Sequence, residues 1–195
     1  MTSSVRPVQP DEASRLAEIG ALTALAYLSD GLVDQSHPYV PQLRDAQARA
    51  EQAILLMLSD GENGEGAAVG TITVVPPGSP FIELATGDEY ELRMLAVSPL
   101  ERGRGIGREL TRQAMDLAVE RGAERIVLST MDTMHAAHRL YESLGFTRRP
   151  DLDWLVADNE DGTVSRITPE QAERMADDPS RPLPAVRLLG YSWEP

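Results

Sequence analysis

Residues 102–107 read Arg-Gly-Arg-Gly-Ile-Gly and are the part of the sequence best suited to bind an anion. They lie between a strand-like run, Glu91–Val97, and a helical pattern over Ile106–Arg121. The first turn of a helix has unpaired backbone N–H groups and the positive end of the helix dipole, and both attract negative charge. Glycine lacks the Cβ atom that would keep phosphate oxygens away from these amides. The spacing therefore predicts a pyrophosphate site at this turn.

Four arginines gather at this turn in an otherwise acidic chain, namely Arg102, Arg104, Arg108 and Arg112. With Glu101 and Glu109, these four arginines give residues 101–112 a net charge of +2. Arg104 and Arg108 are the best placed to contact phosphate, and the alternative is that the arginines only solvate a helix face. A Rossmann fingerprint would need glycine at Arg108, and a Walker loop would need Gly-Lys-Ser/Thr, so neither motif fits.

The composition limits the partners and the chemistry. The chain has 31 acidic and 18 basic residues and a formal charge of -13, so we expect neither nucleic acid nor an anionic membrane as a partner, and a cationic small molecule is favoured. There is no cysteine, so a group transfer cannot pass through an enzyme thioester. The first ten residues contain no apolar run of signal-peptide length, which predicts a cytoplasmic protein.

Strand-like runs and helical patterns alternate along the chain. Strands are predicted at Ser3–Pro7, Ile54–Leu58, Ala68–Val75, Glu89–Val97, Arg125–Ser129, from Phe146 onward and at Ala185–Ser192. Helices are predicted from Asp11 to Gly31, from Pro41 to Ala53, over Ile106–Arg121, and from a cap at Asp132 or Thr133 to Leu144. The second and third strands should pair as a hairpin. The strand, helix, strand order around the glycine turn predicts a right-handed parallel crossover in an α/β fold.

The length of 195 residues suits one well-packed domain, so residues 1–195 are predicted to form a single domain. A polar stretch between Trp154 and Pro184 contains Thr168-Pro169-Glu170-Gln171. These four residues spell a capping box with proline at the first helical position. We interpret residues 157–184 as an inserted polar arm with one short helix.

Two motifs together identify a family resemblance. The first is Arg102-x-x-Gly105-x-Gly107, and the second is the run Leu140-Tyr141-Glu142-Ser143-Leu144-Gly145-Phe146. In this order and at this separation, they resemble the GCN5-related N-acetyltransferase (GNAT) superfamily. The match is close over Glu91–Phe146. One departure is Met134, which stands where family members often carry an asparagine that hydrogen-bonds the pantetheine or a nearby backbone group.

The resemblance implies a GNAT fold with a mixed central sheet of about six or seven strands and about four flanking helices. It also implies acetyl-CoA as the donor, bound in a cleft between splayed central strands, with no metal. The cofactor-binding residues that it implies are Leu95, Ala96, Val97, Arg102, Gly103, Arg104, Gly105, Ile106, Gly107 and Arg108. The backbone of the first three would pair with pantetheine, and the others would surround the pyrophosphate.

Transfer to an amine needs a base, because an alkylamine with a pKa of ~10.4 is protonated at pH 7 and its deprotonation costs about 4–5 kcal/mol. Glu91 is the candidate: it occupies the position of the general base in some GNAT histone acetyltransferases, and strand alternation would put it on the face of Leu95 and Val97. Alternatively, Glu91 pairs with an arginine. Tyr141 is the candidate acid that protonates the leaving thiolate, and its alternative role is packing.

The acceptor is the least constrained part of the prediction. Tyr27, Asp30 and His37 lie where the acceptor pocket of the family usually forms, and the expected acceptor is a primary amine of a small molecule or peptide. His135 and His138 share a helix, but no third metal ligand has a suitable spacing. The sequence leaves open a homodimer, a non-catalytic acyl-CoA sensor, and an interaction protein built around the arm.

Overall fold

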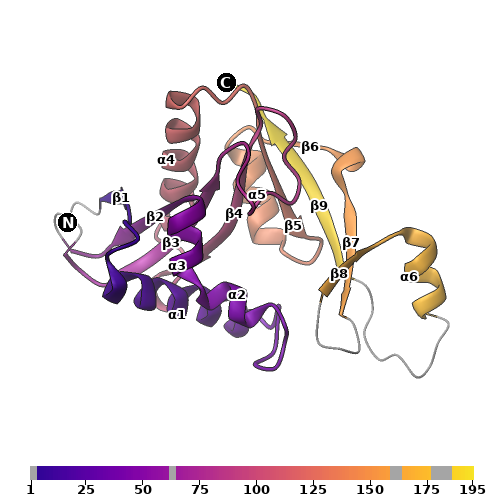
Figure 1. Ribbon diagram of the computed structural model, residues 1–195, viewed down its shortest axis with the longest axis horizontal. Coiled ribbons are helices and arrows are strands. Elements are labelled where there is room, and N and C mark those ends of the chain that lie inside the picture. The colour runs from indigo at the N-terminus through magenta and orange to yellow at the C-terminus, as the bar shows by residue number, and fades with distance from the viewer. Residues whose placement is uncertain (1–3, 62–64, 159–163, 177–185) are drawn as a thin grey trace.

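The computed structural model describes residues 4–61, 65–158, 164–176 and 186–195 (Figure 1). Its strands are β1 (Val5–Pro7), β2 (Ile54–Ser59), β3 (Ala68–Val75), β4 (Tyr90–Val97), β5 (Ile126–Met131), β6 (Thr147–Arg148), β7 (Trp154–Asp158), β8 (Val164–Ile167) and β9 (Val186–Trp193). Its α-helices are α1 (Ala13–Ser29), α2 (Val40–Arg44), α3 (Ala46–Gln52), α4 (Ile106–Glu120), α5 (His135–Ser143) and α6 (Pro169–Ala176). Two short 3₁₀ helices, η2 (Pro99–Glu101) and η3 (Pro150–Leu152), complete these elements.

The described strands form one mixed sheet in the order β1-β2-β3-β4-β5-β9-β7-β8, with β6 paired to β9. The predicted hairpin of β2 and β3 is confirmed, and so is the predicted crossover, because β4 and β5 are parallel neighbours joined through α4. The described sheet has more strands than expected because the hairpin of β7 and β8 was not predicted. The α/β class that the sequence predicted is confirmed.

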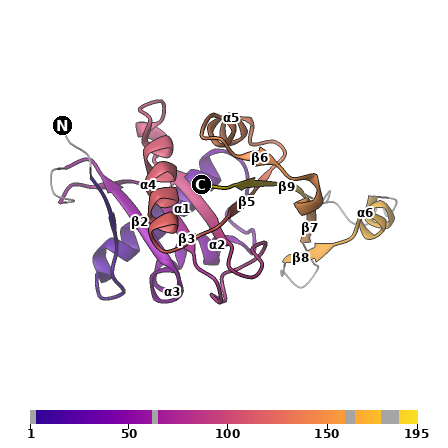
Figure 2. The same ribbon diagram turned by 90° about the horizontal axis from the view of Figure 1, so that it is seen from above.

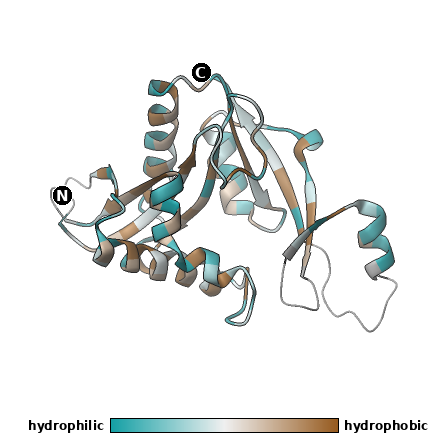
Figure 3. Ribbon diagram, in the orientation of Figure 1, coloured by the Kyte–Doolittle hydropathy of each residue, from teal (hydrophilic) through white to brown (hydrophobic). Residues whose placement is uncertain are grey.

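Helices cover both faces of this sheet (Figure 2). Helices α4 and α5 lie on one face, and α1, α2 and α3 lie on the other. Leu110 and Ala114 of α4 are fully buried, and the hydrophobic colours of Figure 3 concentrate on the central strands and on the helix faces toward them. Gly70 of β3 permits this packing, because a Cβ atom there would lie 2.7 Å from side-chain atoms of Ile106 and Leu110.

A β-bulge in the middle of β4 opens the sheet. Thr73 of β3 is paired with Arg93, but Thr71 is paired with Ala96, so β4 contains one extra residue at this point. Met94 lies in the bulge with a φ of 52°, in the left-handed region. Past the bulge β4 separates from β5, since their pairing ends at Leu92 and Leu128 although both strands continue. The two central strands are therefore splayed.

The bulge also changes which side chains share a face. Leu92 packs in the core under α4, whereas Met94 packs among residues of α1 and α2. Arg93 precedes Met94 on the same side, and Leu95 then returns to the core under α4. Alternation along β4 is thus broken once, between Arg93 and Met94.

Three local predictions differ from the structure. The helix expected from Pro41 to Ala53 is two helices, because Asp45 leaves the helical conformation with a ψ of 72° and caps α3 by accepting the Ala48 N–H at 2.9 Å. The residue that precedes α5 is Met134, not Asp132 or Thr133, and it makes no side-chain cap. The strand expected from Phe146 is the two-residue β6.

The polar arm contains more regular structure than the sequence indicated. It includes the β7–β8 hairpin and α6, which project beyond β9 (Figures 1 and 2). The predicted capping box is confirmed, because the Gln171 side chain accepts the Thr168 N–H at 2.7 Å and the Thr168 hydroxyl accepts the Gln171 N–H at 3.2 Å. Residues 159–163 and 177–184 of the predicted arm lie outside the described residues. The assignment of residues 1–195 to a single domain stays a prediction.

Candidate active site

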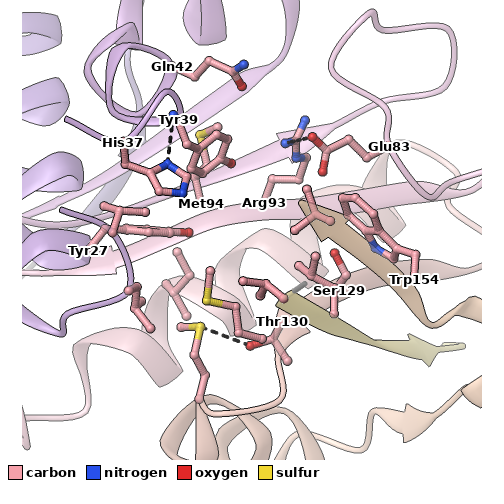
Figure 4. A pocket seen from close by; sticks show the side chains of 18 of the residues that line it. Tyr27, His37, Tyr39, Gln42, Glu83, Arg93, Met94, Ser129, Thr130 and Trp154 are labelled. Carbon is pink, nitrogen blue, oxygen red and sulfur yellow. Dashed lines mark hydrogen bonds and ion pairs between the residues drawn. The ribbon is translucent and has the colours of Figure 1, made fainter. Parts of the chain in front are cut away.

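A cavity of about 1010 Å³ opens where β4 and β5 separate (Figure 4). Leu92–Leu95 of β4 and Ser129–Met131 of β5 form its floor. Its walls come from the segment between the end of α1 and α2, the loop that carries Glu83, and the strands β7, β8 and β9. Met134 and Tyr141, before and within α5, complete them. The cavity therefore continues from the splayed strands into a chamber built by distant segments.

The glycine turn has the open backbone that an anion site requires. Gly103 and Gly105 have φ values of 78° and 80°, and a Cβ atom at either position would meet no atom within 4 Å. Gly105 directly precedes α4, whose first N–H groups have no partner within the helix. The observed geometry thus fits a pyrophosphate at the N-terminus of α4.

The arginines of the turn are paired with protein groups. Arg104 pairs with Glu101, Arg108 donates to the Ser143 hydroxyl at 2.7 Å, and Arg112 pairs with Glu109 and Asp116 on α4. Each of these pairs is on the surface, where an ion pair contributes only about 0–1 kcal/mol. Replacement of such a partner by a phosphate therefore costs little free energy.

Asp30 is not a cavity residue, contrary to the sequence expectation. It is not among the described residues that line the cavity, and both of its carboxylate oxygens pair with the Arg102 guanidinium, Oδ2 at 3.1 Å from Nη2. Asp30 follows α1, and its carboxylate points to the glycine turn. The contact joins the α1–α2 segment to the donor side.

The far half of β4 has one free edge. Ala96 and Val97 pair with Thr71 and Gly70 of β3, while the edge toward β5 is unpaired beyond Leu92. Leu95 lines the cavity at this edge. An extended ligand can add to such an edge as a further strand does.

Glu91 does not lie where the sequence predicted. Because of the bulge it is on the opposite face of β4 from Leu95 and Val97, so the expectation of a shared face is wrong. Glu91 is 1% exposed, and it is not among the described residues that line the cavity. Its Oε2 accepts hydrogen bonds from three consecutive backbone N–H groups, of residues 83, 84 and 85, at 2.9, 2.8 and 3.2 Å. The Glu91 carboxylate thus holds the loop before β4.

The first residue of that loop segment, Glu83, lines the cavity (Figure 4). Its Oε1 lies 2.5 Å from Nη2 of Arg93, and Arg93 also donates to the carbonyl oxygen of Phe81. The Glu83 side chain is 37% exposed, and its partial burial raises the pKa of the carboxyl. Arg93 opposes this effect and the charge of Glu91 adds to it, so the pKa lies above its usual value. Within the described part of the chain, Oε2 of Glu83 has no hydrogen-bond partner. This oxygen is available to a ligand.

Tyr141 of α5 lies on the other side of the splayed strands. It lines the cavity and is 8% exposed, and its ring packs against Phe146 with ring centres 5.8 Å apart. Burial alone raises the pKa of the Tyr141 phenol. The hydroxyl therefore remains protonated at neutral pH and can donate a proton.

Aromatic side chains from the α1–α2 segment form one wall of the chamber. Tyr27, His37 and Tyr39 line it, and Nδ1 of His37 accepts the backbone N–H of Tyr39 at 3.1 Å. The rings of Tyr27 and Tyr39 meet edge to face with centres 6.3 Å apart. The structure thus brings Tyr27 and His37 to the same wall, and their role toward an acceptor stays a prediction. Burial raises the pKa of the Tyr27 and Tyr39 phenols.

Comparison with known proteins agrees with this arrangement. The model of the acetyltransferase (GNAT) family matches residues 22–146, which is more than half of the chain. The chain belongs to the acetyltransferase (GNAT) family.

Two curated relatives give the range of GNAT proteins that it resembles. It is 38% identical over 85 residues to an N-acetylaspartate synthetase of Danio rerio, which is 44% of this chain and 28% of that protein. It is 32% identical over 106 residues to a mycothiol acetyltransferase of Beutenbergia cavernae, covering 54% of this chain and 32% of that protein. The chain therefore matches about a third or less of the length of these relatives.

Two solved structures share the whole GNAT fold at low sequence identity. One is the ribosomal-protein-S18-alanine N-acetyltransferase of Escherichia coli, with a TM-score of 0.61 and 18% identity, covering 99% of this chain and 94% of that one. The other is yncA of Salmonella typhimurium with its cofactor acetyl-CoA, with a TM-score of 0.59, 18% identity and the coverages 100% and 94%.

The residues of this GNAT cavity that sequence reasoning missed include Glu83, Arg93, Trp154 and Arg166. The only signal for Arg93 was a charge inside an apolar strand, and an isolated acid in a proline-rich loop gave no signal for Glu83. Among the described residues, no group of three or more His, Asp or Glu side chains is arranged to hold a metal ion. His138 instead contacts the Met131 carbonyl at 2.9 Å. No helix in the described ranges combines the length and apolarity needed to cross a membrane.

Proposed function

We propose that this protein transfers an acetyl group from acetyl-CoA directly to a primary amine of a small molecule or peptide, in a ternary complex. The observation that carries the proposal is the opening between β4 and β5, because it leaves a free strand edge, shortly before the glycine turn, beside a chamber that holds both a carboxylate and a phenol. The similarity to known N-acetyltransferases supports it. We further propose that residues 1–195 act as one cytoplasmic domain.

The donor is held mainly by backbone groups. The free edge of Leu95–Val97 would pair with the pantetheine, and the amides of residues 103–108 would surround the pyrophosphate. Arg104 and Arg108 would leave their surface partners to neutralise it. When bound, acetyl-CoA supplies the activated acetyl group. The chain has no cysteine, so an enzyme thioester is excluded, and direct attack of the amine on the acetyl carbon fits this absence.

Glu83, rather than Glu91, is the general base of this proposal. Its free Oε2 faces the chamber and would take the proton of the ammonium, directly or through one water. A raised carboxyl pKa makes it a better proton acceptor at neutral pH, because the pKa gap to the amine becomes smaller. Glu91 is then a positioning residue that fixes the backbone of Glu83 and, through its charge, the orientation of Arg93.

Tyr141 is the general acid. Its buried phenol keeps its proton at neutral pH and would give it to the sulfur as the carbon–sulfur bond breaks. The second proton that the nitrogen loses on becoming an amide would then restore the phenol. Glu83 and Tyr141 thus lie on opposite sides of the opening, one toward the acceptor chamber and the other toward the donor cleft.

The test is release of free CoA from acetyl-CoA against a panel of primary amines, with wild type, Glu83→Gln and Tyr141→Phe in parallel. The chain contains no lysine, so acetylation of its own side-chain amines cannot contribute to the signal. Turnover of at least one amine that both substitutions reduce supports the proposal. Tight binding of acetyl-CoA without turnover of any amine would instead identify a non-catalytic acyl-CoA sensor.

A further inference from the structure

The acceptor chamber does not share the strong negative net charge of the whole chain. The chain has a net charge of -13, but the described lining contains two acidic and two basic side chains that are charged at pH 7: Asp34, Glu83, Arg93 and Arg166. Arg93 is already paired with Glu83. Arg166 has no carboxylate within ion-pair distance among the described residues. Arg166 is therefore the basic side chain of this lining that has no acidic partner, and Asp34, which balances its charge, is bound by the N–H and hydroxyl of Ser36 instead.

The β7–β8 hairpin of the arm determines where the Arg166 guanidinium lies. Arg166 of β8 is opposite Val156 of β7 in the hairpin, and its guanidinium lies over the indole of Trp154, 5.0 Å from the ring centre. Trp154 and Val156 line the same chamber. A guanidinium that stacks by its face on an aromatic ring keeps its edge N–H groups free, and these form the fork that binds a carboxylate with two hydrogen bonds.

Arg166 and Glu83 both line the chamber. Burial is the main cause of the raised Glu83 pKa, and Arg166 is among the cations that oppose it, so the two charges interact across the chamber. Figure 4 shows Glu83, Arg93 and Trp154 on the same side of the chamber. A ligand with its amine at Glu83 would thus extend toward the hairpin.

We propose that the acceptor is an amine that also carries a carboxylate, with its amine at Glu83 and its carboxylate on Arg166. This inference rests on the proposed function and narrows its substrate class. It reverses the expectation of a cationic acceptor, because the second ammonium group of a polyamine would face a guanidinium that has no acidic partner in the described lining. The β7–β8 hairpin then determines which amines are accepted.

The test uses matched probes that differ only at the far end. These are linear ω-amino acids with three to five methylene groups, their carboxamides, and the diamines of equal length. Wild type is expected to prefer each carboxylate over its carboxamide by about 10- to 100-fold in kcat/KM, as for a hydrogen-bonded ionic contact. Dipeptides with free and amidated C-termini form a second arm, which separates a free amino acid from a peptide as the source of the carboxylate.

Two substitutions assign this preference to Arg166. Arg166→Gln should abolish it, and Arg166→Glu should reverse it in favour of the diamines. The matched control is Arg174→Gln, an exposed arginine of α6 that does not line the cavity, and it should leave the preference unchanged. Equal melting temperatures of the Gln variants would show that folding is not the cause.

Calorimetric binding of the probes in the presence of CoA gives a readout that does not depend on turnover. If no amine is turned over but the carboxylates bind through Arg166, the proposed function fails and the inference stands. If amines are turned over without a carboxylate preference, the inference fails and the function stands. Retention of the preference in Arg166→Gln would also overturn the inference.

Discussion

The donor side and the acceptor side of the cavity are built in different ways. The donor side is a short continuous segment, in which two glycines with positive φ lead directly into α4. The acceptor chamber combines segments that lie up to about 160 residues apart in the chain, from Tyr27 to Leu188. The difference teaches that recognition by backbone amides leaves a readable local motif, whereas recognition by side chains depends on tertiary structure.

If the two sides are independent, substitutions on one side should leave the other unchanged. Glu83→Gln is expected to give the largest effect, a loss of about 10²–10⁴-fold in kcat, because the base is removed while the size of the side chain is kept. Affinity for CoA, measured by calorimetry, should not change. Glu120→Gln, at an exposed position of α4, is the matched control. Loss of CoA binding in Glu83→Gln would show that the two sides are coupled.

The pH profile examines the same residue in the unmodified enzyme. The acting form of Glu83 is the carboxylate, so kcat/KM should rise as the pH increases through the Glu83 pKa. That pKa lies above the usual value of a glutamate. The limb should therefore appear at a higher pH than for an exposed carboxylate, and it should be missing from Glu83→Gln. A limb that persists in this variant would assign the titration to another group.

Tyr141→Phe is expected to lower kcat by about 10²-fold, the low end of the range for a general acid. The effect is smaller than for Glu83 because a thiolate with a conjugate pKa of ~8.5 leaves without much assistance. Tyr191→Phe is the control, since the Tyr191 ring lies 6.3 Å from the Tyr141 ring but Tyr191 does not line the cavity. Equal activity of the two variants would remove Tyr141 from the chemistry.

Gly105→Ala should act on the donor side alone. A residue with a Cβ atom at a φ of 80° costs about 1–2 kcal/mol, and the altered turn should weaken CoA binding by about 10-fold. Gly122→Ala introduces comparable strain, at a φ of 90° after α4, so it should destabilise the protein without changing CoA affinity. Calorimetry and thermal unfolding of both variants separate binding from stability.

Glu91→Gln should have the smallest effect on catalysis. It weakens three hydrogen bonds to a buried carboxylate, and a bond to a charged group contributes about 1.5–3 kcal/mol. We expect a lower melting temperature, faster hydrogen exchange at residues 83–85, and a decrease in kcat smaller than that of Glu83→Gln. Glu89→Gln, which affects the neighbouring Thr86 amide, is the control. A decrease in kcat equal to that of Glu83→Gln would return the catalytic role to Glu91.

The sequence predicted the features that depend on neighbouring residues. The crossover through α4 was visible because its strands and helix have distinct periodicities, and the capping box at Thr168 was visible because its partners are three residues apart. The cap of α5 was not, because the Asp132 N–H is bound to the Arg187 carbonyl of β9 and the turn follows that contact. Local patterns were therefore reliable only where no distant strand intervened.

For the same reason, the sequence predicted the glycine turn of the candidate site but not the side chains of the acceptor chamber. The glycine turn needs only the correct backbone, and its residues are consecutive. The face of Glu91 was predicted wrongly, because an inserted residue within the apolar run of β4 has no compositional signal. Glu83 and Arg166 become neighbours of one cavity only through the sheet order, which the sequence does not specify.

Met94 sets a limit on how stable this fold can become. Its left-handed backbone costs about 1–2 kcal/mol, yet its side chain is 5% exposed and fills space between α1 and α2. Glycine would relieve the backbone but leave a void, and removal of a buried side chain of this size costs about 2–5 kcal/mol. Selection for heat resistance alone would favour deletion of one bulge residue, because a regular strand would lack this strain. The bulge directly follows the last pair of β4 with β5, so the strained residue lies at the opening of the cavity.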